Sequence, residues 1–367
     1  MFYNWQLDDW KRFTYDKEVL GKPLDAYYQE KNKVFGLRGA LSKKKEISAM
    51  LEVMILEAMK TSEIEGEFMS REDVMSSLKR NLGFDEKIKQ VKDKRAQGIA
   101  DLMVSVRKHF DKPLSQKMLF GWHTMLMRWD KQINVGRWRS GSEPMQVVSG
   151  SIGREKVHFE APPSARVAEE MRSFIQWFNQ SKKTHLSPIR AAIAHLYFES
   201  IHPFEDGNGR IGRAISEKVL YQGEGEPMIL SISQIIESDK KAYYSALKKA
   251  QQTNEVTSWV KFFLNILISA IRKSKENLLF TVQKSNFLEE YRNLLNTRQL
   301  KVIQKMMDAG PNGFEGGMNA RKYLSIAKTS KATATRDLQK LVENEVLVLM
   351  EGRGRSTSYE LNMRLKK

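Results

Sequence analysis

The chain is organised around the sequence His202-Pro203-Phe204-Glu205-Asp206-Gly207-Asn208-Gly209-Arg210-Ile211-Gly212-Arg213. A helical pattern precedes it over residues 189–199, where Ser187 can cap the helix and Pro188 suits its first turn. The proline that follows the histidine prevents this helix from continuing. A second helical pattern runs from residue 211 to about residue 221. This motif, residues 202–213, therefore predicts a helix–loop–helix with a glycine-rich turn.

The turn of the motif is suited to binding an anion. Gly207 and Gly209 let the backbone approach a ligand closely. The unpaired N–H groups at the start of the next helix point back towards the turn, and phosphate is the usual occupant of such a site. Arg210 and Arg213 lie three residues apart on one helical face, where their guanidinium groups can hold neighbouring phosphates.

Three further side chains of the motif suit the transfer of a phosphorus-centred group. Asp206 is an oxygen ligand of the kind that Mg²⁺ takes beside phosphates. His202 titrates near neutral pH and could accept a proton from an attacking hydroxyl. Asn208 could donate a hydrogen bond to developing charge. The alternative is a glycine-rich turn with scattered charges, which explains twelve successive matching positions less well.

The motif resembles, without a departure, the signature of the Fic family, H-P-F-x-[D/N]-G-N-G-R-x-x-R. Fic proteins are mostly adenylyltransferases, which move AMP from ATP onto a Ser, Thr or Tyr hydroxyl of a target protein and release pyrophosphate. The resemblance implies that His202 is the base that deprotonates this hydroxyl and that Asp206 holds Mg²⁺ on the α- and β-phosphates. It implies a β-phosphate contact for Arg210 and a γ-phosphate contact for Arg213. The ATP-binding residues of the motif are then Gly207, Asn208, Gly209, Arg210, Ile211, Gly212 and Arg213.

A second, shorter pattern follows a predicted helix over residues 46–60. Three carboxylates crowd the end of this helix, where the helix dipole disfavours negative charge. Thr61-x-x-x-Glu65-Gly66 resembles the inhibitory pattern of the Fic family, [S/T]-x-x-x-E-[G/N]. The resemblance implies that Glu65 pairs with Arg213 and keeps the γ-phosphate from seating, as in the self-inhibited class with an N-terminal inhibitory helix. Without the motif, the same residues would indicate only a frayed acidic helix end.

Residues 136–163 form the main break from helix. Two strand patterns, at 146–148 and 156–159, flank a polar turn and predict a hairpin. A hairpin here resembles the flap of Fic proteins, which aligns the target segment by strand addition. The resemblance implies target-binding flap residues Val148, Ser149, Gly150 and Ser151. The alternative is an ordinary surface hairpin.

A tyrosine pair follows the motif on a predicted helix. Tyr243 and Tyr244 resemble the pair that contacts the nucleotide near its adenosine in Fic proteins. Core packing is the alternative for both rings, and the sequence leaves the two interpretations open.

From about residue 285 the pattern changes to three short helices and two short strands around a basic tip, which resembles a winged helix. Residues 291–367 carry 15 Lys or Arg and 7 Asp or Glu, a net charge of +8. Thr333, Thr335 and Arg336 lie where a recognition helix would face DNA, and Arg353 and Arg355 lie at the tip. Dimerisation and docking of a target are the alternatives to DNA binding.

The length of 367 residues indicates two or three domains. We expect a mainly α fold with an N-terminal helical segment at 1–95, a Fic catalytic core with a β-hairpin flap at 96–284 and a winged-helix-like domain at 285–367. The chain has no cysteine, which excludes disulfides and thiolate metal sites. The N-terminus lacks the pattern of a secretion signal, and the longest apolar run is too short to span a bilayer. We therefore expect a soluble, cytoplasmic protein without a membrane partner.

Together these features predict a Mg²⁺-dependent protein adenylyltransferase that uses ATP as co-substrate and inhibits itself through Glu65. Its substrate would be a hydroxyl side chain of a target protein or of the enzyme itself, and a homodimer is left open. One alternative is a Fic enzyme that removes AMP or transfers another group, although the complete motif favours AMP transfer. The other is a DNA-binding winged-helix regulator with a nucleotide-sensing Fic core, which draws on the net charge of +17.

Overall fold

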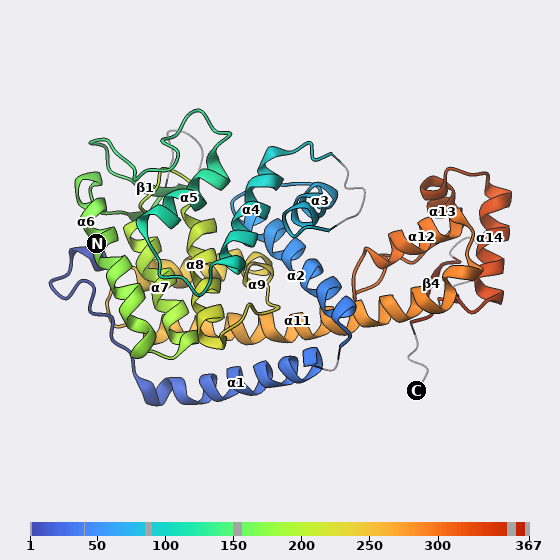
Figure 1. The fold of residues 1–367 in the computed structure, drawn as a ribbon, viewed down its shortest axis with the longest axis horizontal. Coiled ribbons are helices and arrows are strands. Elements are labelled where there is room, and N and C mark those ends of the chain that lie inside the picture. The colour runs from blue at the N-terminus through green and yellow to red at the C-terminus, as the bar shows by residue number, and fades with distance from the viewer. Residues whose placement is uncertain (1, 40, 85–89, 150–155, 351–356, 364–367) are drawn as a thin grey trace. The chain divides into compact units, whose positions relative to one another are not determined.

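The computed structural model describes residues 2–39, 41–84, 90–149, 156–350 and 357–363. These residues form helices and two small antiparallel sheets, which confirms the mainly α fold (Figure 1). The chain divides into a first unit, residues 1–40 and 50–272, and a second unit, residues 41–49 and 273–367. The three-part division at residues 95 and 284 stays a prediction. Within the described ranges, no helix has the length and apolar character needed to cross a membrane.

Two helices, α2 (Lys43–Ile64) and α11 (Thr257–Tyr291), contribute residues to both units. The other helices of the first unit are α1 (Lys17–Gly39), α3 (Arg71–Asn81), α4 (Lys94–Lys108), α5 (Gln116–Met127), α6 (Ser164–Gln180), α7 (Ser187–Ile201), α8 (Asn208–Glu224), α9 (Ile232–Ser238) and α10 (Lys240–Ala250). Short 3-10 turns lie at Asn4–Gln6, Ser181–Lys183 and Arg292–Leu294.

Helices α7 and α8 form the centre of the first unit (Figure 1). Every residue from Pro188 to Ile201 is buried, because other helices surround α7, and the polar residues Arg190, His195 and Glu199 are buried with the apolar ones. The expected cap at Ser187 is wrong by one position: Leu186 occupies the N-cap without a side-chain bond, and Ser187 is already helical. Helix α8 is longer than predicted, from Asn208 to Glu224, and ends at Gly225 with a φ of 75°.

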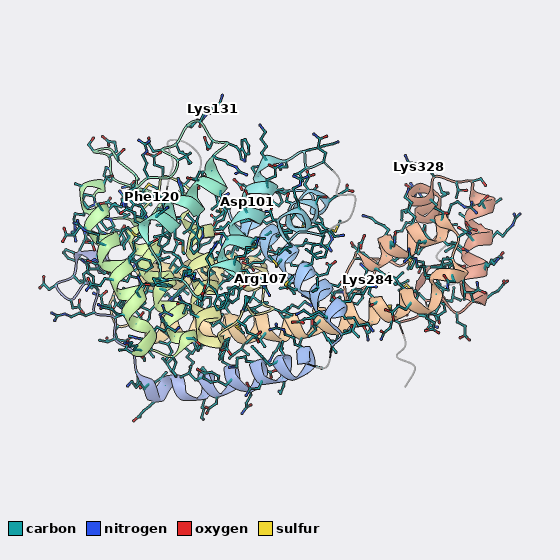
Figure 2. The ribbon with its side chains drawn as sticks, in the orientation of Figure 1. Asp101, Arg107, Phe120, Lys131, Lys284 and Lys328 are labelled. Atoms are coloured by element: carbon teal, nitrogen blue, oxygen red, sulfur yellow. The ribbon has the colours of Figure 1, made fainter. Side chains whose placement is uncertain are left out.

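Polar side chains join the helices around this centre. Figure 2 labels Asp101, which belongs to α4. Its carboxylate accepts hydrogen bonds from Asn81 at the end of α3, at 2.7 Å, and from Arg128 after α5, at 2.8 Å. Helices α3 and α5 begin at serine caps: Ser70 accepts the N–H of residue 73, and Ser115 accepts that of residue 118. The contacts of Asp101 thus join the ends of α3 and α5 to α4.

The hairpin predicted between residues 136 and 163 is present. Strand β1 (Gln146–Ser149) pairs antiparallel with β2 (Lys156–Glu160), with an irregularity between Val147 and Val148. Phe159 is buried and anchors β2, its ring 4.9 Å from that of Tyr3. The hairpin is thereby attached to the first unit at its base.

The second unit contains the predicted order of three helices followed by a hairpin. Helices α12 (Thr297–Met307), α13 (Ala320–Ala327) and α14 (Lys331–Glu343) precede the antiparallel strands β3 (Leu347–Leu349) and β4 (Tyr359–Leu361). Asn296, Asn319 and Ser330 cap the three helices with their side chains. The tip residues Arg353 and Arg355 lie outside the described residues. The winged-helix interpretation stays a prediction.

Candidate nucleotide site

The motif begins where α7 ends. His202 has left-handed backbone geometry, with a φ of 49°, and its N–H donates to the carbonyl of Phe198 at 2.9 Å. Gly207 has a φ of 80° and is the N-cap of α8. Because a left-handed residue favours glycine at the turn, the chain reverses here and starts α8 directly after the loop. The expected helix–loop–helix is therefore present.

The side chain of Asn208 closes the loop between the two helices. Its Oδ1 accepts the N–H of Phe204 at 2.9 Å, and its Nδ2 donates to the carbonyl of Phe204 at 2.8 Å. The amide that we expected to donate to developing charge is thus engaged by the loop itself. The ring of Phe204 stacks on that of His123 in α5, at 4.2 Å between centroids, which anchors the loop.

The start of α8 presents backbone N–H groups as expected. The first N–H bonded within this helix is that of Ile211, to the carbonyl of Gly207 at 3.1 Å. The N–H groups of Asn208, Gly209 and Arg210 therefore have no acceptor within the helix. Such a helix start is suited to a phosphate group.

A cavity of about 800 Å³ lies beside this helix start. The motif, the end of α2, the hairpin and α10 line it together, so residues far apart in the sequence meet at one site. They include Glu65, Gln146, Val147, His158, Phe159, Glu199, His202, Asp206, Asn208, Gly209, Arg213, Tyr243 and Tyr244. Its volume is in the range of small-molecule sites.

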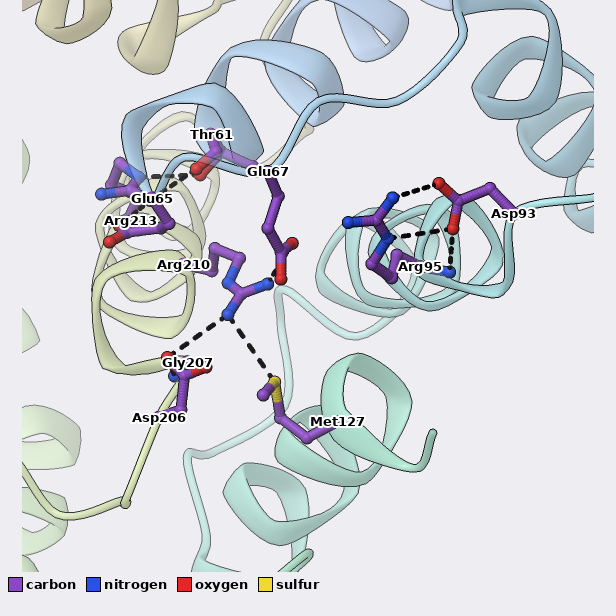
Figure 3. A network of polar contacts seen from close by, with 10 residues as sticks. All are labelled: Thr61, Glu65, Glu67, Asp93, Arg95, Met127, Asp206, Gly207, Arg210 and Arg213. Atoms are coloured by element: carbon purple, nitrogen blue, oxygen red, sulfur yellow. Dashed lines mark hydrogen bonds and ion pairs between the residues drawn. The ribbon is translucent and has the colours of Figure 1, made fainter. Parts of the chain in front are cut away.

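Glu65 pairs with Arg213 at this cavity. Its Oε1 accepts a hydrogen bond from Arg213 Nη2 at 2.6 Å, while the hydroxyl and carbonyl of Thr61 accept from the same guanidinium at 2.7 and 2.8 Å (Figure 3). Burial by itself would lower the pKa of Arg213, but the charge of Glu65 holds that pKa above its usual value. A Cβ at Gly209 would overlap Glu65 Oε1, so this glycine leaves the space for the carboxylate.

Glu67 pairs with the other arginine of the motif, a contact that our reading of the sequence missed. Its Oε2 lies 2.6 Å from Arg210 Nη1, and Arg210 is only 4% exposed (Figure 3). Gly66, with a φ of 82°, turns the chain between the two carboxylates so that both reach α8. The sequence indicated this contact only by placing a second carboxylate two residues after Glu65. Both guanidinium groups are therefore occupied by one short segment after α2.

Asp206 fits a magnesium ion held largely by phosphates. Its side chain is 54% exposed, and Oδ1 accepts from the N–H of Gly207 at 2.5 Å and lies 3.5 Å from Arg210 Nη2. The described residues contain no group of three or more side chains that could ligate a metal. Mg²⁺ commonly binds through one or two carboxylates, with water and substrate phosphates as its other ligands. A single carboxylate beside a phosphate cradle suits that arrangement.

His202 lies in the wall of the cavity. Its Nδ1 is 3.6 Å from Oε2 of Glu199, and its side chain is 15% exposed. Burial, followed by the charge of Arg139, lowers the pKa of His202 to about 4. The imidazole is therefore neutral at pH 7, which is the form that can accept a proton.

Arg139 holds the backbone of the motif and of the segment after β2, and it carried no signal in the sequence. Its Nε donates to the carbonyl of His202 at 2.7 Å, and its Nη2 donates to the carbonyls of Pro162 and Ile201 at 2.5 and 3.3 Å. Burial lowers its pKa to about 10, so it remains charged at pH 7. Arg139 thereby ties the motif to the segment that follows β2.

The two tyrosines differ in their surroundings. Tyr243 is buried, and its hydroxyl is 2.6 Å from Nε2 of His195 in α7. Tyr244 is 43% exposed, and its ring lies 5.1 Å from that of Tyr243. Tyr243 therefore both packs in the core and lines the cavity, while Tyr244 lines the cavity and is partly exposed to solvent.

The four predicted flap residues are only partly described. Val148 and Ser149 belong to β1, opposite Val157 and Lys156 of β2. Gly150 and Ser151 lie outside the described residues. Target binding by these four residues stays a prediction, as do the roles assigned above to the motif residues.

Comparison with known families identifies this part of the chain. Residues 113–220 match the model of the Fic/DOC family, and residues 3–84 match a domain of unknown function, DUF4172. Residues 113–220, which contain the motif, therefore form a Fic domain, as the motif indicated. The family match does not address whether the protein belongs to the self-inhibited class of Fic proteins.

Two curated relatives carry the name protein adenylyltransferase. The protein of Caenorhabditis elegans is 29% identical over 121 residues, which are 31% of this chain and 23% of the relative. The protein of Drosophila virilis is 31% identical over 120 residues, which are 32% of this chain and 24% of the relative. The chain thus matches about a quarter of the length of these relatives.

Solved structures share the fold over a larger part of the chain. A Fic family protein from Desulfovibrio desulfuricans matches with a TM-score of 0.56 and 18% identity, over 97% of this chain and 99% of that one. A Fic domain containing signaling protein from Bacteroides thetaiotaomicron matches with a TM-score of 0.51 and 18% identity, over 72% of this chain and 96% of that one. At these identities the comparison concerns the fold alone.

Proposed function

We propose that the protein is an adenylyltransferase that moves AMP from ATP onto a hydroxyl side chain of a target protein. The observation that carries the proposal is the convergence of His202, the N-terminus of α8 and Arg213 on one cavity, with Arg210 on the same turn of α8. Relatives named protein adenylyltransferase, about 30% identical over about a third of the chain, support the same activity. ATP is accordingly the proposed co-substrate.

In this proposal the triphosphate lies along the start of α8. The N–H groups at that helix start bind phosphate oxygens, Arg210 binds the β-phosphate and Arg213 the γ-phosphate. Asp206 would hold Mg²⁺, which neutralises phosphate charge when it is bound. His202 accepts the proton of the target hydroxyl, whose oxygen bonds to the α-phosphorus. The bond from that phosphorus to pyrophosphate breaks, and pyrophosphate leaves with the electron pair.

The proposal includes self-inhibition by Glu65. The γ-phosphate and the Glu65 carboxylate require the same guanidinium, which Thr61 also holds through two hydrogen bonds. A hydrogen bond between charged groups contributes about 1.5 to 3 kcal/mol, so the carboxylate is a strong competitor. ATP would then bind without seating its γ-phosphate until the segment after α2 moves.

The hairpin would present the target in this scheme. Among the described residues, strand β1 pairs with β2 alone, and a target segment could add to its other edge by main-chain hydrogen bonds. Val148 and Ser149 lie on this strand, and Gln146 and Val147 line the cavity. A hydroxyl side chain on the added segment would then lie on the cavity side. The same reaction on the enzyme itself is a second route for AMP.

Label transfer tests the proposal directly. Purified Glu65→Gly protein is incubated with Mg²⁺ and ATP labelled on the α- or the γ-phosphate, and self-modification is followed by intact mass. We expect α-label and the mass of AMP on the protein, and neither in Glu65→Gly/His202→Ala. Label from the γ-phosphate would indicate phosphate transfer instead. A lack of α-label on the enzyme and on a cell extract added as target would contradict the proposal.

The exposed surface of α14 favours a second candidate function, DNA binding by the second unit. Lys331, Thr335, Arg336 and Lys340 are all exposed on this helix, which Ser330 caps. Contacts to phosphates would make retention on DNA weaken steeply with salt. Retention at low salt that is lost on deleting residues 291–367 would support a regulator with a nucleotide-sensing core. Dimerisation, target docking, AMP removal and a cytoplasmic location are further proposals for this chain.

A further inference from the structure

A buried carboxyl lies against the histidine of the motif. Glu199 is in the last turn of α7, is 5% exposed, and has its Oε2 3.6 Å from His202 Nδ1. Within the described part of the chain, Glu199 Oε1 and His202 Nδ1 are buried atoms without a hydrogen-bond partner. Buried polar groups are nearly always paired, and hydrogen bonds of a catalytic site often tighten only when substrate binds. The oxygen that faces Nδ1 is Oε2, at 3.6 Å, while the unpartnered Oε1 lies beside Gly212. A tighter contact between Oε2 and Nδ1 would pair the two side chains.

The motif itself leaves room for this carboxyl. A Cβ at Gly212 would lie 2.5 Å from Glu199 Oε1, so any side chain there would displace the glutamate. Gly209 leaves the corresponding space for Glu65. The two glycines around Arg210 thus each accommodate one carboxylate, one from α7 and one from the end of α2. The position of Glu199 is therefore built into the packing of α7 against α8.

We propose that Glu199 is the positioning residue for His202, since its carboxylate accepts a hydrogen bond from Nδ1–H and leaves the Nε2 lone pair for the target hydroxyl. A neutral imidazole carries a single N–H, and the partner of that N–H decides which nitrogen is the base. Nδ1 is buried and is the ring nitrogen that lies 3.6 Å from Oε2 of Glu199. The inference rests on the proposed function, because it concerns the base of that reaction.

The proton and charge balance of the transfer supports this role. The hydroxyl O–H bond breaks and its proton goes to Nε2, while the oxygen bonds to the α-phosphorus and pyrophosphate leaves with its electron pair. The ring becomes an imidazolium beside the carboxylate of Glu199. An opposite charge at this distance in a buried site stabilises the cation. The imidazolium then returns its proton to solvent.

Several ionisable groups surround Glu199 and His202 and influence whether Glu199 is ionised. Those that face it are Glu65, Arg139, Asp206, Arg213, Tyr243 and Tyr244. Burial, and then the charge of Glu65, raise the pKa of Glu199 to about 8. A protonated Glu199 would donate to Nδ1 and leave the ring proton on Nε2, where it blocks the base. Glu65 therefore opposes the active tautomer of His202 in addition to occupying Arg213.

Nitrogen NMR of the full chain, labelled at histidine, tests the inference without any turnover. The two ring nitrogens of a neutral histidine have separate ¹⁵N shifts that identify the protonated one, and His202→Ala assigns the signal among the six histidines. We expect Nδ1–H in the wild type at about pH 9, above the Glu199 pKa, and in Glu65→Gly already at about pH 7.5. An Nε2–H tautomer under both conditions would overturn the inference.

The isosteric variant Glu199→Gln adds a second, independent readout. In the Glu65→Gly background we expect kcat to fall by about 10² or more, with the KM for ATP changed less than about twofold and partial rescue by Glu199→Asp. The Nδ1–H preference should also be lost in this variant. Glu205→Gln is the matched control for the tautomer, because Glu205 lines the same cavity but accepts from Asn134 at 2.7 and 2.8 Å.

The two readouts separate the possible failures. If Glu199→Gln keeps both the tautomer and kcat, Glu199 has no positioning role. If no variant transfers AMP, the proposed function fails, while the tautomer of wild-type His202 still decides whether Glu199 orients the ring. Thermal melting followed by circular dichroism confirms that each variant is folded.

Discussion

Glu67 provides the sharpest test of how the segment after α2 controls the motif. Its carboxylate is 2.6 Å from Arg210, whose side chain is 4% exposed, whereas the side chain of Glu67 is 25% exposed. A charge-assisted hydrogen bond of this kind, partly open to water, contributes about 1 to 2 kcal/mol. A β-phosphate that binds Arg210 has to replace it. We therefore expect Glu67→Gln to bind Mg²⁺-ATP about 5- to 30-fold more tightly than the parent chain.

Isothermal titration calorimetry in a His202→Ala background measures this affinity without turnover. Glu63→Gln is the matched control, because it removes a nearby carboxylate, in the last turn of α2, that pairs with Lys60 at 2.6 Å and with neither arginine of the motif. Glu65→Gly/Glu67→Gln should bind more tightly than either single variant, since the two carboxylates occupy different guanidinium groups. Weaker binding by Glu67→Gln would refute the reasoning and mean that Glu67 orients Arg210 for the phosphate.

Three further predictions follow from buried or cavity-lining groups. In the folded protein the pKa of Glu199 is raised to about 8, so the stability that its protonated form contributes is fully present below the unfolded pKa and is lost as pH rises towards about 8. The free energy of unfolding therefore falls between about pH 6 and 8. In Glu199→Gln this fall should be shallower by about 1.4 kcal/mol per pH unit. Tryptophan fluorescence during urea unfolding measures this slope in the first unit, which contains all seven tryptophans, and equal slopes would contradict it. Arg139→Leu should lower the same unfolding free energy by at least about 3 kcal/mol, because it leaves buried carbonyls unpaired, whereas the exposed neighbour Arg137→Leu should change it little. Tyr244→Ala should weaken ATP binding by about 1 to 3 kcal/mol if its ring stacks on the base, and an unchanged dissociation constant would show that it does not.

Much of the local structure could be predicted because it depends on residues close together in the chain. The caps at Ser70, Ser115 and Asn296 use a side chain and N–H groups within three residues. The turn at Gly207 needs a left-handed residue, which glycine supplies. The motif, the end of α2 and the hairpin were each recognisable on their own for this reason.

The motif also specified more of the candidate site than its length suggests. Twelve adjacent residues carry the histidine, the helix start and both arginines, so their mutual placement follows from one loop and one helical turn. The pairing of Glu65 with Arg213 was expected only because the sequence resembles a family in which it occurs. The structure has this pair at 2.6 Å, across 148 positions of the chain.

By itself, the sequence determined the helical architecture, the Fic motif and the residue types at the site. Only the tertiary structure decided that Glu67 meets Arg210, that Arg139 holds the motif backbone, and that Glu199 lies against His202 in the space left by Gly212. Periodicity specifies which face of a helix is buried, but not which residue of another helix lies opposite. Those partners depend on how α2, α7 and α8 pack, and the ionisation of the site depends on the resulting burial.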